Sequence, residues 1–427
     1  MIIYYILIWS LPYMRHPIWN ASLGGGFTVT KLIGAASILY GLTYLARRHD
    51  LPRYFATPQS RWMMLLMGFA FYSFLTTLGQ HAEVDLGSPM AAYASAILLF
   101  FVTLTVIDSV RRLYWSMMLA TGTVAFASLY FLREWSRGIT VYGEGFRAGW
   151  VLGDANYFTI AALVTLPIAF ELLLISRKRW EKLYLFGCMF LTFFTVTLGA
   201  SRGGFLGMVA EIIYLVVRSG ISKKNLVRIM VAAIPLVILL PNSPMHRLLS
   251  PGISDTRSVE NHIVGWMAGL NMVTEHPFVG IGLGNYKEQV AKYDKTGQVA
   301  ANPHIAHNAY LEIAAEMGIP AAVVFLIFLG TTLRSIETTR KRALAANSKV
   351  LASIALGMGA SLLGPSIAIF FVSGQYTRMF WFILVMSMAM PALVPKRRAA
   401  QTKIPAQEEQ LTEDSDLQIG TVLIEMR

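Results

Sequence analysis

The sequence predicts an all-α fold, a polytopic integral membrane protein, on three observations. The chain has 427 residues, of which 55% are hydrophobic and only 14% charged, whereas a soluble domain carries about a quarter charged residues. Its apolar residues form long continuous runs, which a helix needs to cross a bilayer. Its basic residues gather in alternate connections between those runs. The net charge of +12 therefore reflects membrane topology and not nucleic-acid binding.

Twelve segments have the composition of a transmembrane helix, for which about 20 apolar residues are needed. They are residues 1–14, 26–46, 62–79, 89–107, 113–132, 157–176, 183–199, 204–218, 226–241, 308–332, 350–372 and 379–394. The first is short for a span, and it lacks the basic start and cleavage site of a signal peptide. The runs are too long and continuous for the strands of a β-barrel. Residues 1–394 are thus expected to form a single transmembrane domain.

Lysine and arginine assign the sides of the membrane. The basic connections, predicted to be cytoplasmic, are 46–53, 110–113, 176–182, 218–228, 333–343 and 395–403. Both termini then lie inside, and residues 395–427, rich in Glu, Gln, Asp and Lys, are expected to be a disordered cytoplasmic tail. The remaining connections face outward, including a large periplasmic loop at residues 241–307.

This loop has internal order in its sequence. Apolar residues in SVENHIVGWMAGLNMVTEHP (258–277) recur at helical spacing, which predicts an amphipathic helix on the membrane or on the spans. Gly280, Gly282 and Gly284 follow. No strand precedes them, so a dinucleotide loop is excluded, and they indicate a close-packed turn or a backbone lid near a ligand.

Arg202 lies between two apolar runs with almost no loop around it. An arginine at membrane depth costs ~2.5–3.5 kcal/mol. Its side chain either extends to the outer headgroups or forms an anion site, and we favour the anion site because guanidinium matches phosphate in a bidentate way. Gly203 and Gly204 leave room for the backbone, and the start of a helix favours negative charge.

Two more arginines are candidates in the outer segments. Arg147 precedes Asp154 and Asn156, so it either binds an acidic ligand or pairs with Asp154, which is also placed to cap the helix that follows. Arg257 and His262 open the amphipathic helix of the loop, where Arg257 is either solvated or able to close over a phosphate.

The tenth predicted span begins with a polar cluster. Asn308, Glu312 and Glu316 share one helical face, and His307 and Tyr310 are neighbours on the next stripe. Ionisable groups that enter hydrocarbon tend to mark function, and histidine exchanges protons near neutral pH, so His307 is a candidate catalytic base. His304 is expected to be a loop residue. The spacing of the two histidines differs from that of zinc proteases and no third ligand is evident, so no metal site is predicted.

Four segments together resemble the bacterial O-antigen ligase and O-antigen polymerase superfamily. HNAYLEIAAEMGIPAAVVFL (307–326) resembles its HN-x-hydrophobic-L-x-x-x-x-E-x-G-x-x-G motif, with alanine in place of the second glycine. TLGASRGGFLG (197–207), TEHPFVGIGLGNY (274–286) and GFRAGWVLGDANYF (145–158) are similar to three further motifs, with Ala155 where proline is usual. The resemblance covers most of residues 130–330.

The resemblance implies a GT-C-like membrane glycosyltransferase that moves a glycan from an undecaprenyl-diphosphate carrier to an acceptor outside the bacterial inner membrane, without a metal, a nucleotide sugar or another cofactor. It implies that Arg202 and His307 are essential. The family's second arginine often stands where this chain has His262, with Arg257 just before it. By this resemblance Arg202, Arg257 and His307 are catalytic, and Arg147, Asp154, Asn156, His262, Asn308, Tyr310 and Glu312 bind substrate.

The sequence leaves the acceptor open. A ligase would use lipid A-core or another surface polysaccharide, a polymerase a growing polysaccharide, and a protein O-oligosaccharyltransferase a protein hydroxyl. A secondary transporter is a different class, which would place ionisable residues near span centres. Here the charges cluster at one face of the membrane, which favours the transferase. Its partners are then a lipid-linked glycan, an acceptor and membrane lipids.

Overall fold

In the computed structural model, all regular structure within the described residues is helical, as the sequence predicts. The structure describes residues 1–13, 28–46, 56–77, 88–137, 155–199, 201–219, 253–298 and 303–395. The helices are α1 (Ile2–Ser10), η1 (Leu11–Tyr13), α3 (Val29–Leu45), α5 (Pro58–Thr76), α6 (Pro89–Val106), α7 (Val110–Ser136), α8 (Ala155–Ile175), α9 (Arg179–Gly199), α10 (Arg202–Ser219), α13 (Ile253–Glu275), α14 (Tyr286–Tyr293), α15 (Ala309–Met317), α16 (Ile319–Ala345), α17 (Lys349–Ala368), η4 (Gly374–Tyr376), α18 (Arg378–Ala389) and η5 (Met390–Leu393).

Six of these helices are long and apolar enough to cross a membrane, which are α6, α7, α8, α9, α16 and α17. Segments Ile2–Tyr13, Val29–Leu45 and Arg378–Leu393 are apolar but shorter. The protein is therefore an integral membrane protein by its helices, while the count of twelve spans stays a prediction. The predicted span at 226–241 and the tail after Pro395 lie outside the described residues.

The bundle around α18 has an apolar interior. All residues of α18 from Met379 to Ala389 are buried, and the helix packs against α6, α8, α16 and α17. By contrast, α9 exposes Leu183, Phe186 and Phe190 at helical spacing, as expected for a face in contact with lipid chains. Hydropathy alone does not separate these two kinds of apolar helix.

The predicted span at 308–332 is wrong at its start. The chain forms two helices there, α15 and α16, which are divided at Gly318 with φ 88°. A side chain at this position would lie 2.3 Å from the carbonyl oxygen of Phe278, so both the left-handed backbone and the space require glycine. Pro320 then occupies the first turn of α16, where its missing N–H costs nothing. Glu312 and Glu316 consequently lie on α15, outside the long apolar helix.

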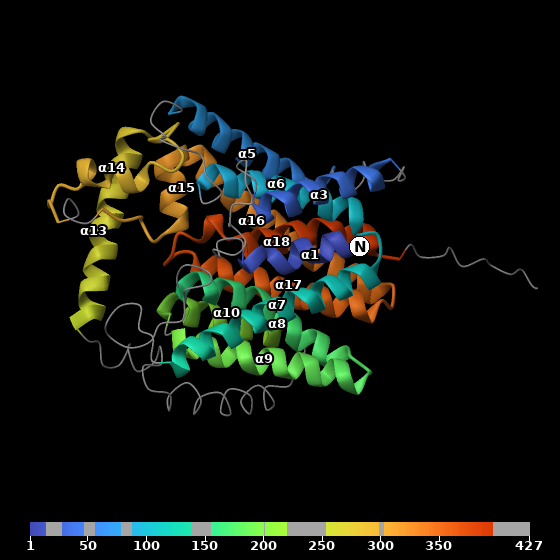
Figure 1. Cartoon of the computed structure of the whole chain (residues 1–427). Helices are drawn as coiled ribbons and strands as arrows, with labels where there is room; N and C mark the ends of the chain where they lie inside the picture. Colours follow the sequence, from blue (N-terminus) through green and yellow to red (C-terminus); the bar gives the residue numbers. More distant parts are fainter. Residues whose placement is uncertain are drawn as a thin grey trace, which may run out of the picture. The chain divides into compact units, whose positions relative to one another are not determined.

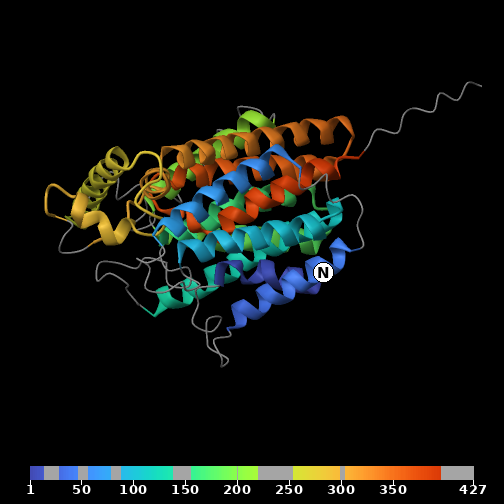
Figure 2. The same ribbon diagram turned by 90° about the horizontal axis from the view of Figure 1, so that it is seen from above.

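One end of the bundle carries α13, α14 and α15, and we call it the α13 end (Figure 1). A view from above also shows α13 and α14 at this end, away from the N-terminus (Figure 2). Helix α13 occupies the segment expected to be amphipathic and packs on α14 and α15. The turn at 280–284 packs on α15, where Ile281 N donates to Ala315 O and Gly282 N to Glu316 O. Of the two interpretations of its glycines, a close-packed turn is confirmed.

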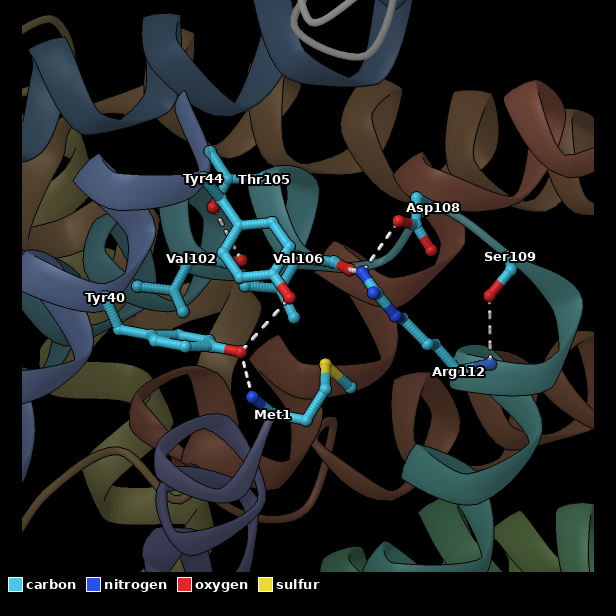
Figure 3. Close-up of polar contacts among 9 residues, drawn as sticks. All are labelled: Met1, Tyr40, Tyr44, Val102, Thr105, Val106, Asp108, Ser109 and Arg112. Atoms are coloured by element: carbon cyan, nitrogen blue, oxygen red, sulfur yellow. Dashed lines mark hydrogen bonds and ion pairs between the residues drawn. The ribbon is translucent and has the colours of Figure 1, made fainter. Parts of the chain in front are cut away.

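The opposite end holds basic residues in local pairs. Arg112 donates to Asp108 Oδ2 at 2.7 Å and to Val106 O at 2.9 Å, and its guanidinium lies over the ring of Tyr44 (Figure 3). The terminal amino group of Met1 donates to Tyr40 Oη beside this pair (Figure 3). Connections predicted to be cytoplasmic thus meet at this end, whereas which end faces the cytoplasm stays a prediction.

Candidate active site at the α13 end

His307 has an unusual backbone immediately before α15. Its φ of 50° is in the left-handed region, which is rare for residues other than glycine and costs of the order of 1–3 kcal/mol where it is held. Asn308 caps α15, since its Oδ1 accepts from Tyr310 N at 3.0 Å and from Leu311 N at 3.1 Å. His307 is therefore outside the helix, and the expected helical stripe of His307 and Tyr310 is wrong.

Three imidazole rings gather at this point. The ring of His307 stacks on that of His262 from α13, with centroids 5.0 Å apart and planes 23° apart. His304 lies on the other loop position, 6.3 Å from His307 by ring centroids, and its Nε2 is 3.0 Å from Asn261 O. His304 is a loop residue as expected, but the sequence gave no reason to place it with His262.

Arg202 begins α10 and is half-buried. Its positive charge acts on His262, as do those of His307 and His304, which places its guanidinium near the stacked rings. Burial is the largest effect on His262, and together with these charges it lowers the pKa of His262 from 6.5 to about 4. At neutral pH the ring is therefore uncharged.

Two contacts hold Arg202 in this position. Ser201 Oγ accepts from Gly204 N at 3.2 Å, which caps α10, and donates to Asn156 Oδ1 on α8 at 2.7 Å. A side chain on Gly204 would come within 2.1 Å of Thr159, so glycine permits the close approach of α10 to α8. Asn156 thus ties together the starts of two helices.

The two glutamates of α15 do not supply a partner to an imidazole through the hydrogen bonds described. Glu312 accepts from Ser373 Oγ and from Gln375 Nε2, the latter at 2.8 Å. Glu316 accepts from Tyr376 Oη at 2.7 Å and from Tyr286 N at 3.1 Å. Burial raises the pKa of both carboxyl groups, and the charge of Glu316 raises that of Glu312 further. These side chains join α15 to the turn before α18 and to the start of α14.

Aromatic side chains enclose the cluster. Trp266 packs edge-on to Phe370 with centroids 5.5 Å apart, and its Nε1 donates to Ala306 O at 2.9 Å. Tyr310 donates its hydroxyl to Ser366 O at 2.6 Å, which anchors α15 on α17. Trp266 was expected only as an apolar residue of an amphipathic helix. Its spacing gave no signal for a role beside the histidines.

Not every candidate is brought to this end by the described residues. Arg147 and Asp154 lie outside them, and Arg257 lies on α13 within residues 253–259, whose side chains are not described. Within the described part of the chain no group of three His, Cys, Asp or Glu side chains is placed to hold a metal ion. The cluster therefore consists of Arg202, His262, His304 and His307.

Two buried acids were missed by the sequence analysis. Glu171 of α8 and Glu211 of α10 are 4% and 3% exposed, within apolar helices. The expectation that ionisable groups cluster at one face is thus wrong for these two residues. A single acidic residue in an otherwise apolar run was the available signal.

The α13 end can therefore bind an anion and move a proton. Arg202 supplies a cation that is bidentate toward phosphate, and the imidazoles supply proton acceptors next to it. Helix α10 adds its positive N-terminal end at the same point.

Comparison with known proteins locates this cluster in a family. No match was found among the curated proteins. Residues 187–326 match the family described as O-antigen ligase. This region begins in α9, ends in α16, and contains all four residues of the cluster. The resemblance predicted from four short motifs is confirmed: the chain carries an O-antigen ligase family region at residues 187–326, which supports its membership of the O-antigen ligase and polymerase superfamily.

Proposed function

We propose that the protein transfers a glycan from an undecaprenyl-diphosphate carrier to an acceptor hydroxyl at the periplasmic face of the bacterial inner membrane. The family match points to activity of the O-antigen ligase or polymerase type, and within it we propose the ligase type, with lipid A-core or a surface polysaccharide as acceptor. The observation that carries the proposal is the meeting of Arg202 with the stacked His262 and His307 at one end of the bundle.

Arg202 binds the diphosphate in this mechanism. A new bond forms between the acceptor oxygen and the anomeric carbon while the bond from that carbon to the diphosphate breaks. Negative charge develops on the departing phosphate oxygen, and a guanidinium already in place stabilises it. Undecaprenyl diphosphate is the leaving group.

His307 takes the proton of the acceptor hydroxyl as the new bond forms. General-base catalysis of this kind contributes roughly 10²–10⁴-fold to the rate. His262 is uncharged at neutral pH, so it adds no cation to repel the imidazolium that forms on His307. We assign His262 the role of positioning the His307 ring by stacking, and Glu312 that of fixing α15 beneath it.

Transfer from a purified undecaprenyl-diphosphate glycan to candidate acceptors, with EDTA present, tests the proposal. Wild-type protein should form product, while Arg202→Ala and His307→Ala should not, at equal expression and with the same elution profile in size-exclusion chromatography. His276→Ala is a matched control, because His276 lies just after α13 and bonds to Tyr293 Oη at 3.0 Å outside the cluster. Normal product in both site variants would remove the mechanism.

A secondary transporter is the second candidate, because Glu171 and Glu211 are buried within apolar helices where a transporter needs ionisable groups. Under the transferase proposal neither carboxyl takes part in chemistry. Glu211→Gln protein should therefore keep its transfer rate. Counter-transport of a small ion that Glu211→Gln abolishes, with no glycan product from the wild type, would favour the transporter.

A further inference from the structure

A cavity outside the histidine cluster lies at the start of α18. It contains about 460 Å³ of empty space, part of it open to solvent. Its walls come from η1, α8 and α18, with Leu11, Pro12, Tyr157, Ala161, Met379 and Arg378 among them. Pockets of this size that are mostly apolar and contain one charged group are typical ligand sites.

A second pocket shares two walls with the first. It contains about 280 Å³ of empty space between α1, α6 and α18, and both Leu11 and Arg378 line it as well. Its other walls are almost entirely apolar, including Leu99 and Trp381. Arg378 thus stands between a mixed cavity and an apolar groove, which suits a ligand with an anionic head and a hydrocarbon chain.

The start of α18 adds to the attraction for an anion. Thr377, the residue before α18, makes no side-chain cap bond, and it lines the first cavity together with Arg378. The first N–H groups of a helix and its dipole favour negative charge. An arginine at this depth is costly unless it serves structure or a ligand.

The cavity is close to the cluster but separate from it. On α8, Asn156 faces Ser201 and so the start of α10, whereas Tyr157 and Ala161, one turn apart, line the cavity. Tyr376 also lines it and donates to Glu316 on α15. A lipid in the cavity would therefore lie beside the first turn of α8, next to Arg202.

We propose that this cavity binds the phosphate end of an isoprenoid carrier lipid, with the phosphate on Arg378 and the first isoprene units in the groove beside Trp381. The identity of the lipid rests on the proposed function. Charge complementarity selects a phosphate, and the groove that opens from the same arginine selects a linear apolar chain over a headgroup alone. The site holds the carrier before or after transfer at Arg202.

Binding of undecaprenyl phosphate to the full chain in phosphatidylcholine nanodiscs tests this site. Arg378→Ala should weaken binding about tenfold or more, and Arg378→Lys less, because a charged donor is lost in one and kept in the other. Arg334→Ala is the matched control, since Arg334 is exposed on α16 far from the cavity. Unchanged affinity in Arg378→Ala would overturn the proposal.

Two further ligands separate the lipid sources. Undecaprenol, which lacks the phosphate, should bind weakly and should not distinguish Arg378→Ala from wild type. Phosphatidylglycerol should compete poorly; equal competition would show a general anionic-lipid site and overturn the choice of an isoprenoid.

Photo-crosslinking avoids dependence on a variant that might fail to fold. A diazirine-bearing undecaprenyl phosphate should label Leu11, Tyr157 or Met379 in the wild-type protein. Labels confined to α10 and α13 would contradict the site. The outcome is independent of transfer: binding at Arg378 without any glycan product would leave this site standing and sink the proposed function, and the reverse result would do the opposite.

Discussion

The two ends of the bundle both gather basic and aromatic side chains, but they treat charge in opposite ways. At the end shown in Figure 3, Arg112 pairs with Asp108 at 2.7 Å, and on α16 Arg340 pairs with Glu337 at 3.3 Å. At the α13 end, Arg202 lies with three histidines, and within the described residues no carboxylate is at ion-pair distance from it. The nearby acids Glu312 and Glu316 accept from hydroxyl, amide and backbone groups instead.

This difference separates charges that serve topology and packing from charges kept for a ligand. Paired surface ions contribute little and need no further partner. A cluster of like charge, half-buried, is unfavourable by itself and becomes favourable when an anion binds. The predictions below test the two ends against each other.

The largest effect is expected at His307. His307→Gly should lower the transfer rate by roughly 10²–10⁴-fold because the proton acceptor is lost. Glycine accepts the left-handed backbone at this position, so the fold should be kept. Added imidazole should restore part of the rate in a transfer assay. A variant that has lost activity and recovers none of it, although imidazole binds, would argue for a structural role.

The next effect is expected at Arg202, compared with Arg112 at the other end. Arg202→Ala should lower transfer about 10²–10³-fold through loss of charge stabilisation, with Arg202→Lys intermediate. Arg112→Ala should leave the rate within about twofold, because it removes a surface ion pair. Rates measured at saturating carrier lipid check this. Equal losses in both variants would erase the distinction between the ends.

The pH dependence of stability should differ at His262. Its pKa is lowered to about 4 in the folded protein, so the unfolded chain binds the proton first as pH falls below 6.5. The contribution of His262 to the free energy of unfolding is therefore full above pH 6.5 and is lost as pH falls toward 4. It amounts to at most ~3 kcal/mol, since water reaches part of the ring.

Thermal unfolding in detergent at several pH values measures this. Wild type should lose more stability than His262→Asn between pH 7 and pH 5, and His276→Asn should behave as wild type. Parallel curves for wild type and His262→Asn would contradict the buried, uncharged ring.

The smallest effect is expected at Asp108. Asp108→Asn removes the partner of Arg112 and should change the free energy of unfolding by no more than about 1 kcal/mol, with transfer unchanged. The same thermal and transfer measurements apply. A loss of transfer here would indicate that the two ends are coupled.

Much of the fold was predictable because hydropathy and helical periodicity are local. Helices α6, α8 and α9 begin and end close to the predicted spans, and α13 occupies the predicted amphipathic segment. The break at Gly318 was missed because apolar residues continue across it, although glycine followed by Pro320 was the local signal.

The site was predictable in its members and not in its arrangement. The identities of Arg202, His262 and His307 followed from residue types and motifs, but the stack of His262 on His307 joins positions 45 residues apart, and no spacing rule relates them. The partners of Glu312 in the turn before α18 depend on tertiary packing in the same way.

The shared site of Arg202 and His307 is the central claim, and a double-mutant cycle on single-turnover transfer from an undecaprenyl-diphosphate glycan tests it most directly. Groups that act as a unit on one bond lose activity non-additively. The double variant Arg202→Ala with His307→Ala should therefore be little slower than the worse single variant. A double variant whose loss equals the product of the two single losses, or a wild-type rate in either single variant, would contradict the account.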